Sequence, residues 1–449
     1  MNPKISWCSG LALTVLLVSV ALTACGYKSN NYSRGPTAVA FARYSATNGA
    51  PDTSLPGGSG LVTTEVSTSQ DDIAFAVVAQ PDGKIISVGS SSTTPARVVV
   101  IRYNANGTLD STFGSGGITV TSLPSADADG FAAILQADGK LLVAGRSCPL
   151  SGFCGFLLLR YHTDISTGAP GTLDTTGFGS PNGYVTTGIP SGVSNSANAI
   201  ALSGTNIVLA GQSKIGGRFV FALAQYTSSG ALDSTFGSGG IVTTPIFSLD
   251  ALAAAVAVQG DGKIVAAGLA GSTSSNVWDV ALLRYNANGS LDTGFGGGDG
   301  IVTTDIGSSS NYANAVTLQA DGKIVVAGNA FASSLANTSD IAVLRYNTDG
   351  TLDTTGFGSP NGYVTTNVGA FDNGFAVAVQ ADNKIVVAGN ADAGGGDRLA
   401  LLRYNADGSP DSGFGTGGVV TRAASGPSTI VGAFAVSLQP TAIVVVGYD

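Results

Sequence analysis

The stretch Gln319-Ala-Asp-Gly-Lys323, continued by Ile324-Val-Val-Ala-Gly328 and later by Val343-Leu-Arg-Tyr-Asn347, decides the fold because it recurs along the chain. Counterparts of its first part are Gln80-Pro-Asp-Gly-Lys84, Gln136-Ala-Asp-Gly-Lys140, Gln259-Gly-Asp-Gly-Lys263 and Gln380-Ala-Asp-Asn-Lys384. The Arg of the Arg-Tyr pair recurs at Arg43, Arg102, Arg160, Arg284, Arg345 and Arg403, and Gln225 replaces it once. The chain therefore contains seven units, 58 to 65 residues apart. A period of this size indicates a repeat architecture.

Each complete unit contains four runs of strand length. In one unit they cover residues 313–319, 323–328, 341–347 and 362–366. The Asp-Gly pair between the first two predicts a hairpin, because it accepts the positive φ of a two-residue turn. A longer turn containing Gly joins the third and fourth. Four antiparallel strands repeated seven times predict an all-β fold, a seven-bladed β-propeller with four-stranded blades.

The two ends of the chain each supply half a unit. The N-terminal part holds a third and a fourth strand, at Arg43-Tyr44 and 61–64, and the C-terminal part a first and a second, at 434–439 and 443–447. We therefore predict that these four strands share the closing blade, which hides apolar faces that an open array would expose. The propeller is expected to span residues 36–449.

The units resemble delta-60 repeats, tandem modules of bacterial exported proteins. Those repeats share the core Gln-x-Asp-Gly-Lys-Ile-Val-Val-Ala-Gly, followed by Arg-Tyr-Asn and Leu-Asp-x-x-Phe-Gly. The resemblance covers roughly residues 36–449 and is weakest in the third unit, where Ser203-Gly-Thr-Asn206 and Gln225 replace the usual residues. It implies a propeller-like fold and no common catalytic activity.

The first 26 residues resemble the signal peptide of bacterial lipoproteins. Lys4 precedes an apolar stretch, 11–22, that is too short to span a bilayer comfortably, and Leu22-Thr-Ala-Cys25-Gly26 is similar to a lipobox. The resemblance implies cleavage before Cys25 and acylation of Cys25 by diacylglycerol and palmitate-type chains, which gives stable anchoring. The alternative is an ordinary secretory signal.

This resemblance also predicts the limits of the N-terminal segments and the location of the protein in the cell. Residues 1–24 would be the signal peptide, and residues 25–35 a lipidated tether. The mature protein would lie in the cell envelope, attached to the membrane through its lipid. Because Gly26 and not Asp follows the modified Cys, the family rule favours the outer membrane in a Gram-negative cell.

Net charge and cysteine content limit the kinds of partner, cross-link and metal site that the sequence predicts. Without residues 1–24 the chain has 19 basic against 29 acidic residues, a net charge of −10, so nucleic acid is not an expected partner. The remaining cysteines, Cys148 and Cys154, predict one small disulfide in an oxidising compartment. A metal site needs more ligands than these thiols and His162 provide. We expect a monomer.

The polar residues repeated in every unit could form seven equivalent sites or could hold the blades together. We favour the structural role, with each Arg paired to an Asp and each Tyr packed between blades, because a residue needed in every blade serves the blade. They include Arg102, Tyr103, Asp110, Arg284, Tyr285, Asp292, Arg345, Tyr346 and Asp353. The turn at 347–353 is also similar to a calcium loop, but the bidentate Glu is missing and the same residues suit an Asx turn. Calcium therefore stays open as an alternative, and no other cofactor is expected.

The loops fall into two classes on opposite faces. The repeat face carries the Asp-Gly-Lys turns and the Asn-x-Asp-Gly turns, which hardly change between units. The variable face carries the fourth-to-first and the second-to-third connections, the latter at 90–96, 146–155, 212–217, 269–278, 329–339 and 390–397. Since function concentrates on loops held by a scaffold, we predict binding on the variable face.

Asp and Asn residues precede or begin each first strand on that face. If the first strand is innermost, they surround the mouth of a central channel and could hold a cation or bind sugar hydroxyls. The alternative is that they satisfy backbone N–H groups where strands begin. The candidate ligand-binding residues are Asp72, Asp129, Asn198, Asp250, Asn311 and Asp372, with Tyr312 and Trp278 nearby.

These features favour a lipid-anchored binding or scaffold module for a protein or glycan partner. The chain has one His and one Glu, so no catalytic residue is predicted and we lean towards a protein that is not an enzyme. The alternative function is an Asp-dependent polysaccharide hydrolase or lyase at the channel mouth, which requires two carboxylates in different environments.

Overall fold

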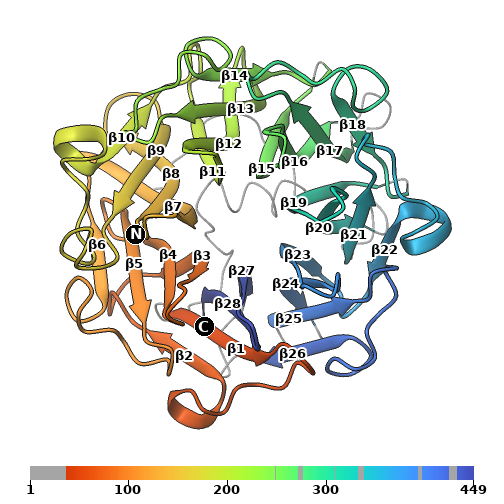
Figure 1. Ribbon diagram of the computed structural model, residues 1–449, viewed down its shortest axis with the longest axis horizontal. Helices are drawn as coiled ribbons and strands as arrows, with labels where there is room; N and C mark the ends of the chain where they lie inside the picture. The colour runs from red at the N-terminus through yellow and green to blue at the C-terminus, as the bar shows by residue number, and fades with distance from the viewer. Residues whose placement is uncertain are drawn as a thin grey trace, which may run out of the picture.

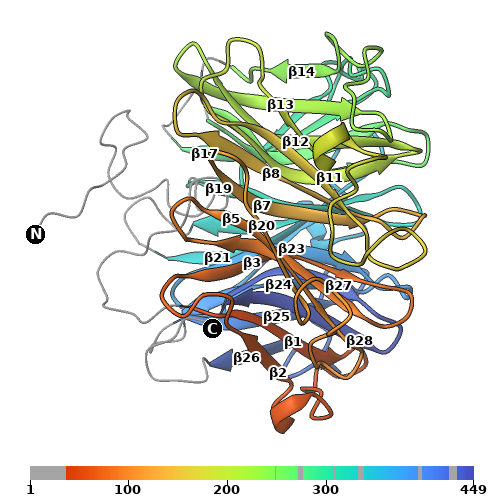
Figure 2. The same cartoon turned by 90° about the vertical axis from the view of Figure 1, so that its left-hand side faces the viewer.

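The computed structural model describes residues 37–247, 249–271, 277–307, 309–331, 338–392, 397–423 and 432–448. These residues form seven four-stranded antiparallel sheets, arranged as blades around a central axis (Figure 1). The strands run from one face of the disc to the other, and the connecting loops lie at these two faces (Figure 2). The prediction of an all-β, seven-bladed propeller is confirmed. The predicted signal peptide and tether, with Cys25, lie outside the described residues, as do parts of three second-to-third connections on the variable face.

The blades are numbered 1 to 7 in the chain order of their first strands. The first, innermost strands are β3 (Asp72–Ala79), β7 (Ala126–Leu135), β11 (Asn195–Ser203), β15 (Ala251–Val258), β19 (Asn311–Leu318), β23 (Asp372–Val379) and β27 (Gly432–Leu438). The second strands are β4 (Ile85–Ser91), β8 (Leu141–Pro149), β12 (Asn206–Ile215), β16 (Ile264–Gly271), β20 (Ile324–Phe331), β24 (Ile385–Asp392) and β28 (Ala442–Tyr448).

The two outer strands of each blade follow in the same order. The third strands are β5 (Arg97–Tyr103), β9 (Gly155–Tyr161), β13 (Arg218–Tyr226), β17 (Trp278–Tyr285), β21 (Ser339–Tyr346), β25 (Asp397–Tyr404) and β1 (Val39–Ser45). The fourth are β6 (Ile118–Thr121), β10 (Tyr184–Thr187), β14 (Ile241–Thr244), β18 (Ile301–Thr304), β22 (Tyr363–Thr366), β26 (Val419–Ala423) and β2 (Leu61–Thr64).

Three short helical turns, η1 (Pro56–Gly58), η2 (Gly179–Gly183) and η3 (Gly358–Gly362), lie in third-to-fourth connections. None of the helical segments in the described part of the chain has the length and apolar character needed to cross a membrane.

Blade 7 contains strands from both ends of the chain, in the order β2-β1-β28-β27. The whole of β1 pairs with β28, from Val39 opposite Tyr448 to Ser45 opposite Ala442. Backbone hydrogen bonds therefore join the two ends and close the ring.

The apolar runs of the repeat are continuous because both faces of a blade are covered. In β20, Ile324 and Val326 pack in the cluster shared with blade 4, whereas Val325 and Ala327 pack in the cluster shared with blade 6. All four side chains are fully buried. A strand covered on both faces needs apolar residues at consecutive positions, which explains the Ile-Val-Val-Ala sequence.

The hairpin turn between first and second strands differs from the two-residue turn that we predicted. In blade 1, Gln80 N donates to Lys84 O at 2.8 Å, so Pro81, Asp82 and Gly83 form a three-residue loop. Only Gly83 has a positive φ, 84°. The Asp82 carboxylate instead accepts a hydrogen bond from Lys84 N at 3.1 Å. The prediction was wrong because the Asp is present for its side-chain hydrogen bond and only the Gly for its backbone angle.

Candidate functional site

The repeated Arg, which is on the third strand of every blade except blade 3, joins its own blade to the next. In blade 5, the Arg345 Nε atom lies 2.9 Å from Asp353 Oδ2, which also accepts a hydrogen bond from Lys323 Nζ at 2.7 Å. Arg345 also donates to Ala406 O in blade 6 at 2.5 Å, and its guanidinium lies 4.9 Å from the centroid of the Phe357 ring. The planar guanidinium has enough donors for all these contacts.

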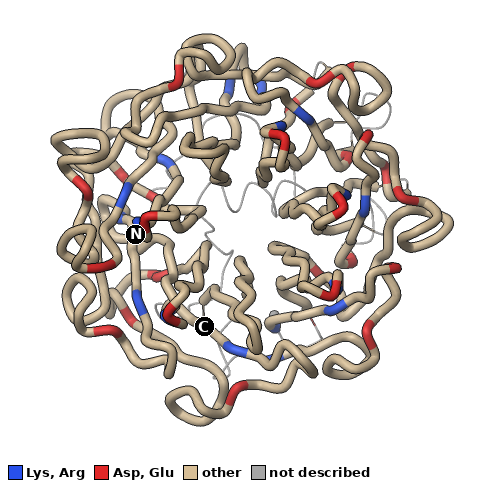
Figure 3. Tube along the Cα trace, in the orientation of Figure 1, with Lys and Arg blue, Asp and Glu red and all other residues tan. Residues whose placement is uncertain are grey.

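The same contacts recur around the ring, at Arg102 with Asp110 and at Arg284 with Asp292. The hydrogen bond from Lys263 is the largest influence on Asp292, and together with Arg284 it lowers the pKa of that carboxyl to about 2. Basic and acidic residues are both distributed around the ring (Figure 3). The described residues show no feature of a nucleic-acid-binding surface.

In blades 1 to 6, the repeated Tyr joins its blade to the preceding one. The hydroxyl groups of Tyr103 and Tyr285 donate to the hydroxyl oxygens of Thr64 and Thr244, both at 2.8 Å. The equivalent pair in blade 5 is Tyr346 with the Thr that ends β18, also 2.8 Å apart. Burial raises the pKa of Tyr103 to about 12. The repeated Arg side chains therefore contact an Asp and backbone carbonyls, and the repeated Tyr side chains contact a Thr of the preceding blade.

In blade 3, uncharged donors contact the repeated Asp. Its Asp233 carboxylate accepts hydrogen bonds from Gln225 at 3.2 Å and from Asn206 at 2.8 Å. Gln225 stands in the place of the Arg and Asn206 in the place of the Lys, so two amides replace two cations together.

The turns considered for calcium are closed by their own hydrogen bonds. Asp349 Oδ1 accepts from the backbone N and the hydroxyl of Thr351, at 2.9 and 2.7 Å. Across the described residues, no three His, Cys, Asp or Glu side chains gather in a way that could hold a metal ion.

Asp72 and Asp372, predicted at the channel mouth, are fully buried where their strands begin. Asp72 Oδ2 accepts from Val66 N at 2.9 Å and from Ser67 N at 2.7 Å. Asp372 makes the same pair of bonds, at 2.6 and 2.9 Å, with the loop that precedes β23. Burial raises the pKa of Asp372 despite these bonds. Both carboxylates close the fourth-to-first connection and do not face solvent.

The other polar candidates also contact their own surroundings. Asp250 Oδ1 accepts from Phe219 N of blade 3 at 2.7 Å, and Asn311 donates to Ser309 O at 2.8 Å. Asp129 forms an ion pair with an Arg of β8, with an O–N distance of 2.8 Å. Asp250 thus accepts from a backbone N–H group, as the alternative interpretation has it, whereas Asn311 donates to a backbone carbonyl and Asp129 pairs with a side chain.

The two aromatic candidates lie in a small apolar cluster. Tyr312 is buried against Leu252 and Leu269, and Trp278 packs partly buried on the same cluster. Burial raises the pKa of Tyr312 to about 12. Tyr312 therefore packs between blades 4 and 5 and does not face a ligand site.

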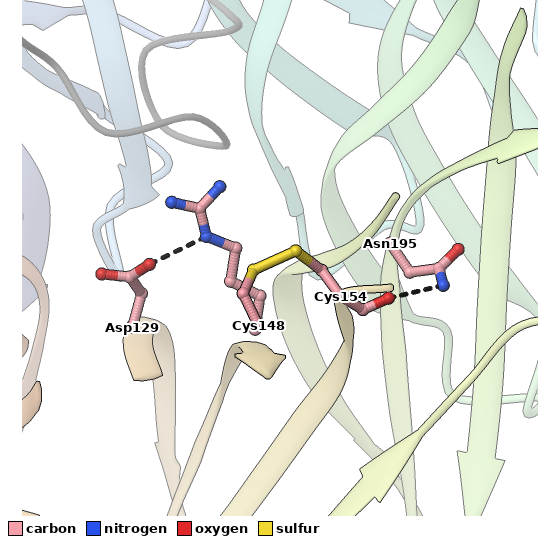
Figure 4. The surroundings of a disulfide bond; sticks show 5 residues. Asp129, Cys148, Cys154 and Asn195 are labelled. Atoms are coloured by element: carbon pink, nitrogen blue, oxygen red, sulfur yellow. Dashed lines mark hydrogen bonds and ion pairs between the residues drawn. A yellow bond between two sulfur atoms is a disulfide. The ribbon is translucent and has the colours of Figure 1, made fainter. Parts of the chain in front are cut away.

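A disulfide between Cys148 and Cys154 closes the second-to-third connection of blade 2 (Figure 4). Asn195 of blade 3 donates to Cys154 O at 2.7 Å, which ties this loop to the next blade. Leu150 and Phe153, inside the closed loop, are 78% and 65% exposed. The disulfide thus holds two exposed apolar side chains on the variable face.

Three fourth-to-first connections on the variable face carry further exposed apolar residues. Val193 precedes β11, Phe247 precedes β15 and Phe371 precedes β23, and all three are exposed. Leu150 and Phe153 lie between β8 and β9, Val193 lies between β10 and β11, and Phe247 lies between β14 and β15, all on the variable face of blades 2 to 4. We call these four residues the apolar rim.

Sequence reasoning missed a second group, on the axis of the propeller. Each innermost strand has one β-bulge at a corresponding position. Because neighbouring blades cover both faces of each sheet, only a residue displaced by a bulge can turn its side chain to the axis. The bulged residues, which we call the channel ring, are Phe75, Phe131, Asn198, Ala254, Asn314, Phe375 and Phe434, and they line a cavity of about 130 Å³.

The repeated Gly of the second strand makes the bulge possible. A Cβ atom on Gly328 would lie 1.7 Å from Tyr312 O, the carbonyl oxygen two residues before the bulged Asn314. The corresponding distance is between 1.6 and 1.9 Å in all seven blades. Since φ at Gly328 is not positive, the Gly is needed for space and not for its backbone freedom.

A sequence signal for the channel ring exists. A small residue, a variable residue and Ala follow one another in every first strand, as in Ala74-Phe75-Ala76, Gly130-Phe131-Ala132 and Ala313-Asn314-Ala315. A large Phe between two small residues marks the one position of the strand whose side chain does not pack between blades. Of the predicted ligand residues, only Asn198 belongs to the ring. The lining of this cavity carries no carboxylate within the described residues.

Several solved structures are similar in fold. A protein of unknown function from Dyadobacter fermentans is 11% identical, with 71% of this chain and 93% of that chain covered and a TM-score of 0.39. A polysaccharide lyase, an ulvan lyase, is 13% identical, with 78% and 83% covered and a TM-score of 0.43. An α-L-arabinofuranosidase of Fusarium graminearum is 10% identical, with 74% and 93% covered and a TM-score of 0.44.

No curated protein matches the chain. A family model described as a beta-propeller domain of unknown function (DUF5122) matches five segments, residues 80–113, 206–236, 259–295, 319–355 and 380–414. Each segment runs from the hairpin turn or second strand of a blade, through its third strand, into the turn that follows. Five segments of the chain are therefore similar to DUF5122 beta-propeller repeats, which is consistent with a propeller repeat family.

Proposed function

We propose that the chain is a binding module that engages a protein or glycan partner through its variable face. The apolar rim is the observation that carries this proposal. Apolar side chains that remain exposed on adjoining loops are typical of interaction surfaces, because their burial against a partner is favourable. The Arg, Asp and Tyr residues of the repeat, by contrast, are occupied in holding the blades together.

The geometry of the rim supports a preformed surface. The Cys148–Cys154 disulfide restricts the loop that presents Leu150 and Phe153, and the bond from Asn195 joins this loop to blade 3. A loop held in its bound conformation loses less entropy on association than a free one. The rim is therefore suited to a partner with a complementary apolar surface.

The proposal includes the cellular address implied by the sequence. Residues 1–24 would be removed, Cys25 would carry the lipid, and residues 25–35 would tether a single propeller, 36–449, to the membrane of the cell envelope. Metabolic labelling with a fatty-acid analogue tests this part, with Cys25→Ser as the variant that should lose the label. A label that persists in the variant would contradict lipidation at this residue.

The binding function is tested by affinity capture from a cell-envelope extract, beside a glycan array. Replacing Leu150 and Phe153 by Asp should reduce capture of a specific partner by about tenfold or more, since each Asp would have to be desolvated in the interface. The matched control is Ile165→Asp, which changes a residue that is 82% exposed on the repeat face. Equal loss in the control and the rim variant, or no loss in either, would contradict binding through the rim.

A further inference from the structure

The channel ring surrounds the axis of the propeller and has an apolar side and a polar side. Blades 6, 7, 1 and 2 follow one another around the ring and supply the four Phe residues, Phe375, Phe434, Phe75 and Phe131. Their ring centroids are separated by 5.0, 5.5 and 5.5 Å in that order. Aromatic rings at such separations are in contact, so they form one continuous apolar wall.

Blades 3, 4 and 5 supply the other side, with Asn198, Ala254 and Asn314. Asn314 donates to Asn329 Oδ1 at 3.0 Å and to Gly374 O at 2.9 Å, which uses both of its N–H groups. Since only the nitrogen can donate to a backbone carbonyl, the bond to Gly374 fixes the orientation of this amide. Within the described residues its Oδ1 atom has no partner and is available as an acceptor.

Asn198 is complementary to Asn314. It donates one N–H to Ala253 O at 2.8 Å and accepts from the Ser196 hydroxyl at 2.9 Å. An amide nitrogen carries two hydrogens, so one donor of Asn198 remains. Ala254, between the two Asn residues, has the smallest side chain of the ring and leaves room beside them. The polar side therefore offers one donor and one acceptor.

The size and charge of the cavity limit what it can hold. Its volume of about 130 Å³ is close to the roughly 150 Å³ of an engineered cavity that accepts benzene, so it has room for the ring atoms of one six-membered ring, whose larger substituents would extend along the axis. None of the seven lining side chains is charged, and a charged group held there without a counterion would be costly to desolvate. A ligand with a wholly apolar ring would leave the remaining N–H donor of Asn198 and the Oδ1 acceptor of Asn314 without partners.

We propose that the channel ring binds one neutral pyranose ring, either a free sugar or the terminal residue of a glycan. The C–H face of the sugar would lie against the Phe wall, and its hydroxyl groups, which both donate and accept, would pair with Asn198 and Asn314. This site is separate from the apolar rim, so it does not depend on the function proposed for the variable face.

The test uses the protein with its cysteines oxidised and a panel of methyl pyranosides and short oligosaccharides, measured by calorimetry and ligand-observed NMR. The blocking variant is Ala254→Phe, because Phe already occupies the bulged position in four other blades and should be accepted by the fold. The control is Ala254→Ser, which keeps the cavity open. Circular dichroism and the urea midpoint report whether both variants fold.

We expect saturable binding of at least one pyranoside to the wild type and to Ala254→Ser, and a loss of about tenfold or more in Ala254→Phe. Comparison of the affinities for methyl pyranosides and for oligosaccharides shows whether the bound pyranose is a free sugar or the terminal residue of a glycan. Equal binding in folded Ala254→Phe would overturn the proposal. It would also be overturned if no sugar binds at concentrations on the order of 10 mM. A third contrary result is binding of choline alone, because the Phe wall would then hold a quaternary ammonium ion.

Discussion

Replacement of Gly328 by Ala should strongly destabilise the propeller, although it adds one methyl group. The added Cβ would lie 1.7 Å from Tyr312 O and 2.8 Å from the carbonyl carbon of the same residue. Carbon and oxygen approach in proteins to about 3.3 Å, so the carbonyl would have to move by roughly 1.5 Å. Ladder hydrogen bonds on both sides of the bulge hold that carbonyl, and β19 has neighbours on both faces.

The expected cost follows from this overlap. Extra methyl groups in well-packed regions typically cost 1–3 kcal/mol, and a clash with backbone belongs at the upper end, so we expect about 3 kcal/mol. The matched control is Gly260→Ala, where the Cβ would meet no atom within 4 Å and φ is not positive. Ala already stands at the equivalent positions 137, 320 and 381. This control should be neutral or stabilise by about 0.4–1 kcal/mol.

Urea unfolding followed by circular dichroism measures both variants, with the free energy of unfolding obtained from the midpoint and slope. Gly328→Ala should unfold at a clearly lower urea concentration than Gly260→Ala, without a change in the far-UV spectrum before the transition. If the two variants unfold within about 0.5 kcal/mol of each other, the bulge gives way easily. The Gly would then not be required for it, and the reasoning would fail.

Three further substitutions test the contacts between and within blades. Asp372→Asn should raise the urea midpoint near neutral pH and leave it unchanged in acid. Burial raises the pKa of Asp372 in the folded protein, so the wild-type fold is most stable while this carboxyl is protonated. Its free energy of unfolding then falls as the pH rises through that pKa. Tyr285→Phe should cost about 1 kcal/mol of unfolding free energy, because it removes a buried hydrogen bond and leaves the Thr244 hydroxyl without it. Arg345→Lys should cost about 2–3 kcal/mol, since an ammonium group can contact Asp353 but cannot also reach the carbonyls bound by the guanidinium; a midpoint equal to that of the wild type in either of the last two variants would contradict the proposed contacts.

The number of blades was predictable because it depends only on the period of the sequence. Hydrophobic runs and turn residues repeat with the unit, and they specify four strands without any knowledge of side-chain contacts. The roles of Asp72 and Asp372 were not predictable in this way. Polar residues where strands begin can face solvent or accept hydrogen bonds from their own loop, and the choice depends on how the fourth-to-first connection folds over them.

The channel ring escaped prediction for a different reason. A pattern of alternating positions assigns every strand residue to one of two faces, and a bulged residue belongs to neither. Such a pattern therefore does not separate Phe75 and Phe434 from apolar residues of the core, or Asn314 from other polar residues near the start of a strand. The small residues on both sides of each of them were the available evidence.

The bulge itself can be explained without a ligand, because an innermost strand is an edge strand and a bulge prevents further pairing along it. Edge protection, however, requires only an extra residue and sets no condition on its side chain. Edge protection alone would therefore predict no order among the seven side chains. Instead, the four Phe residues occupy consecutive blades, and the two Asn residues lie opposite them on either side of Ala254. The Gly in every second strand allows each blade to place one residue on the axis, whereas the identity of that residue is free to vary. The most regular part of the repeat thus creates the position at which the blades differ, and Ala254→Phe tests whether that difference serves binding.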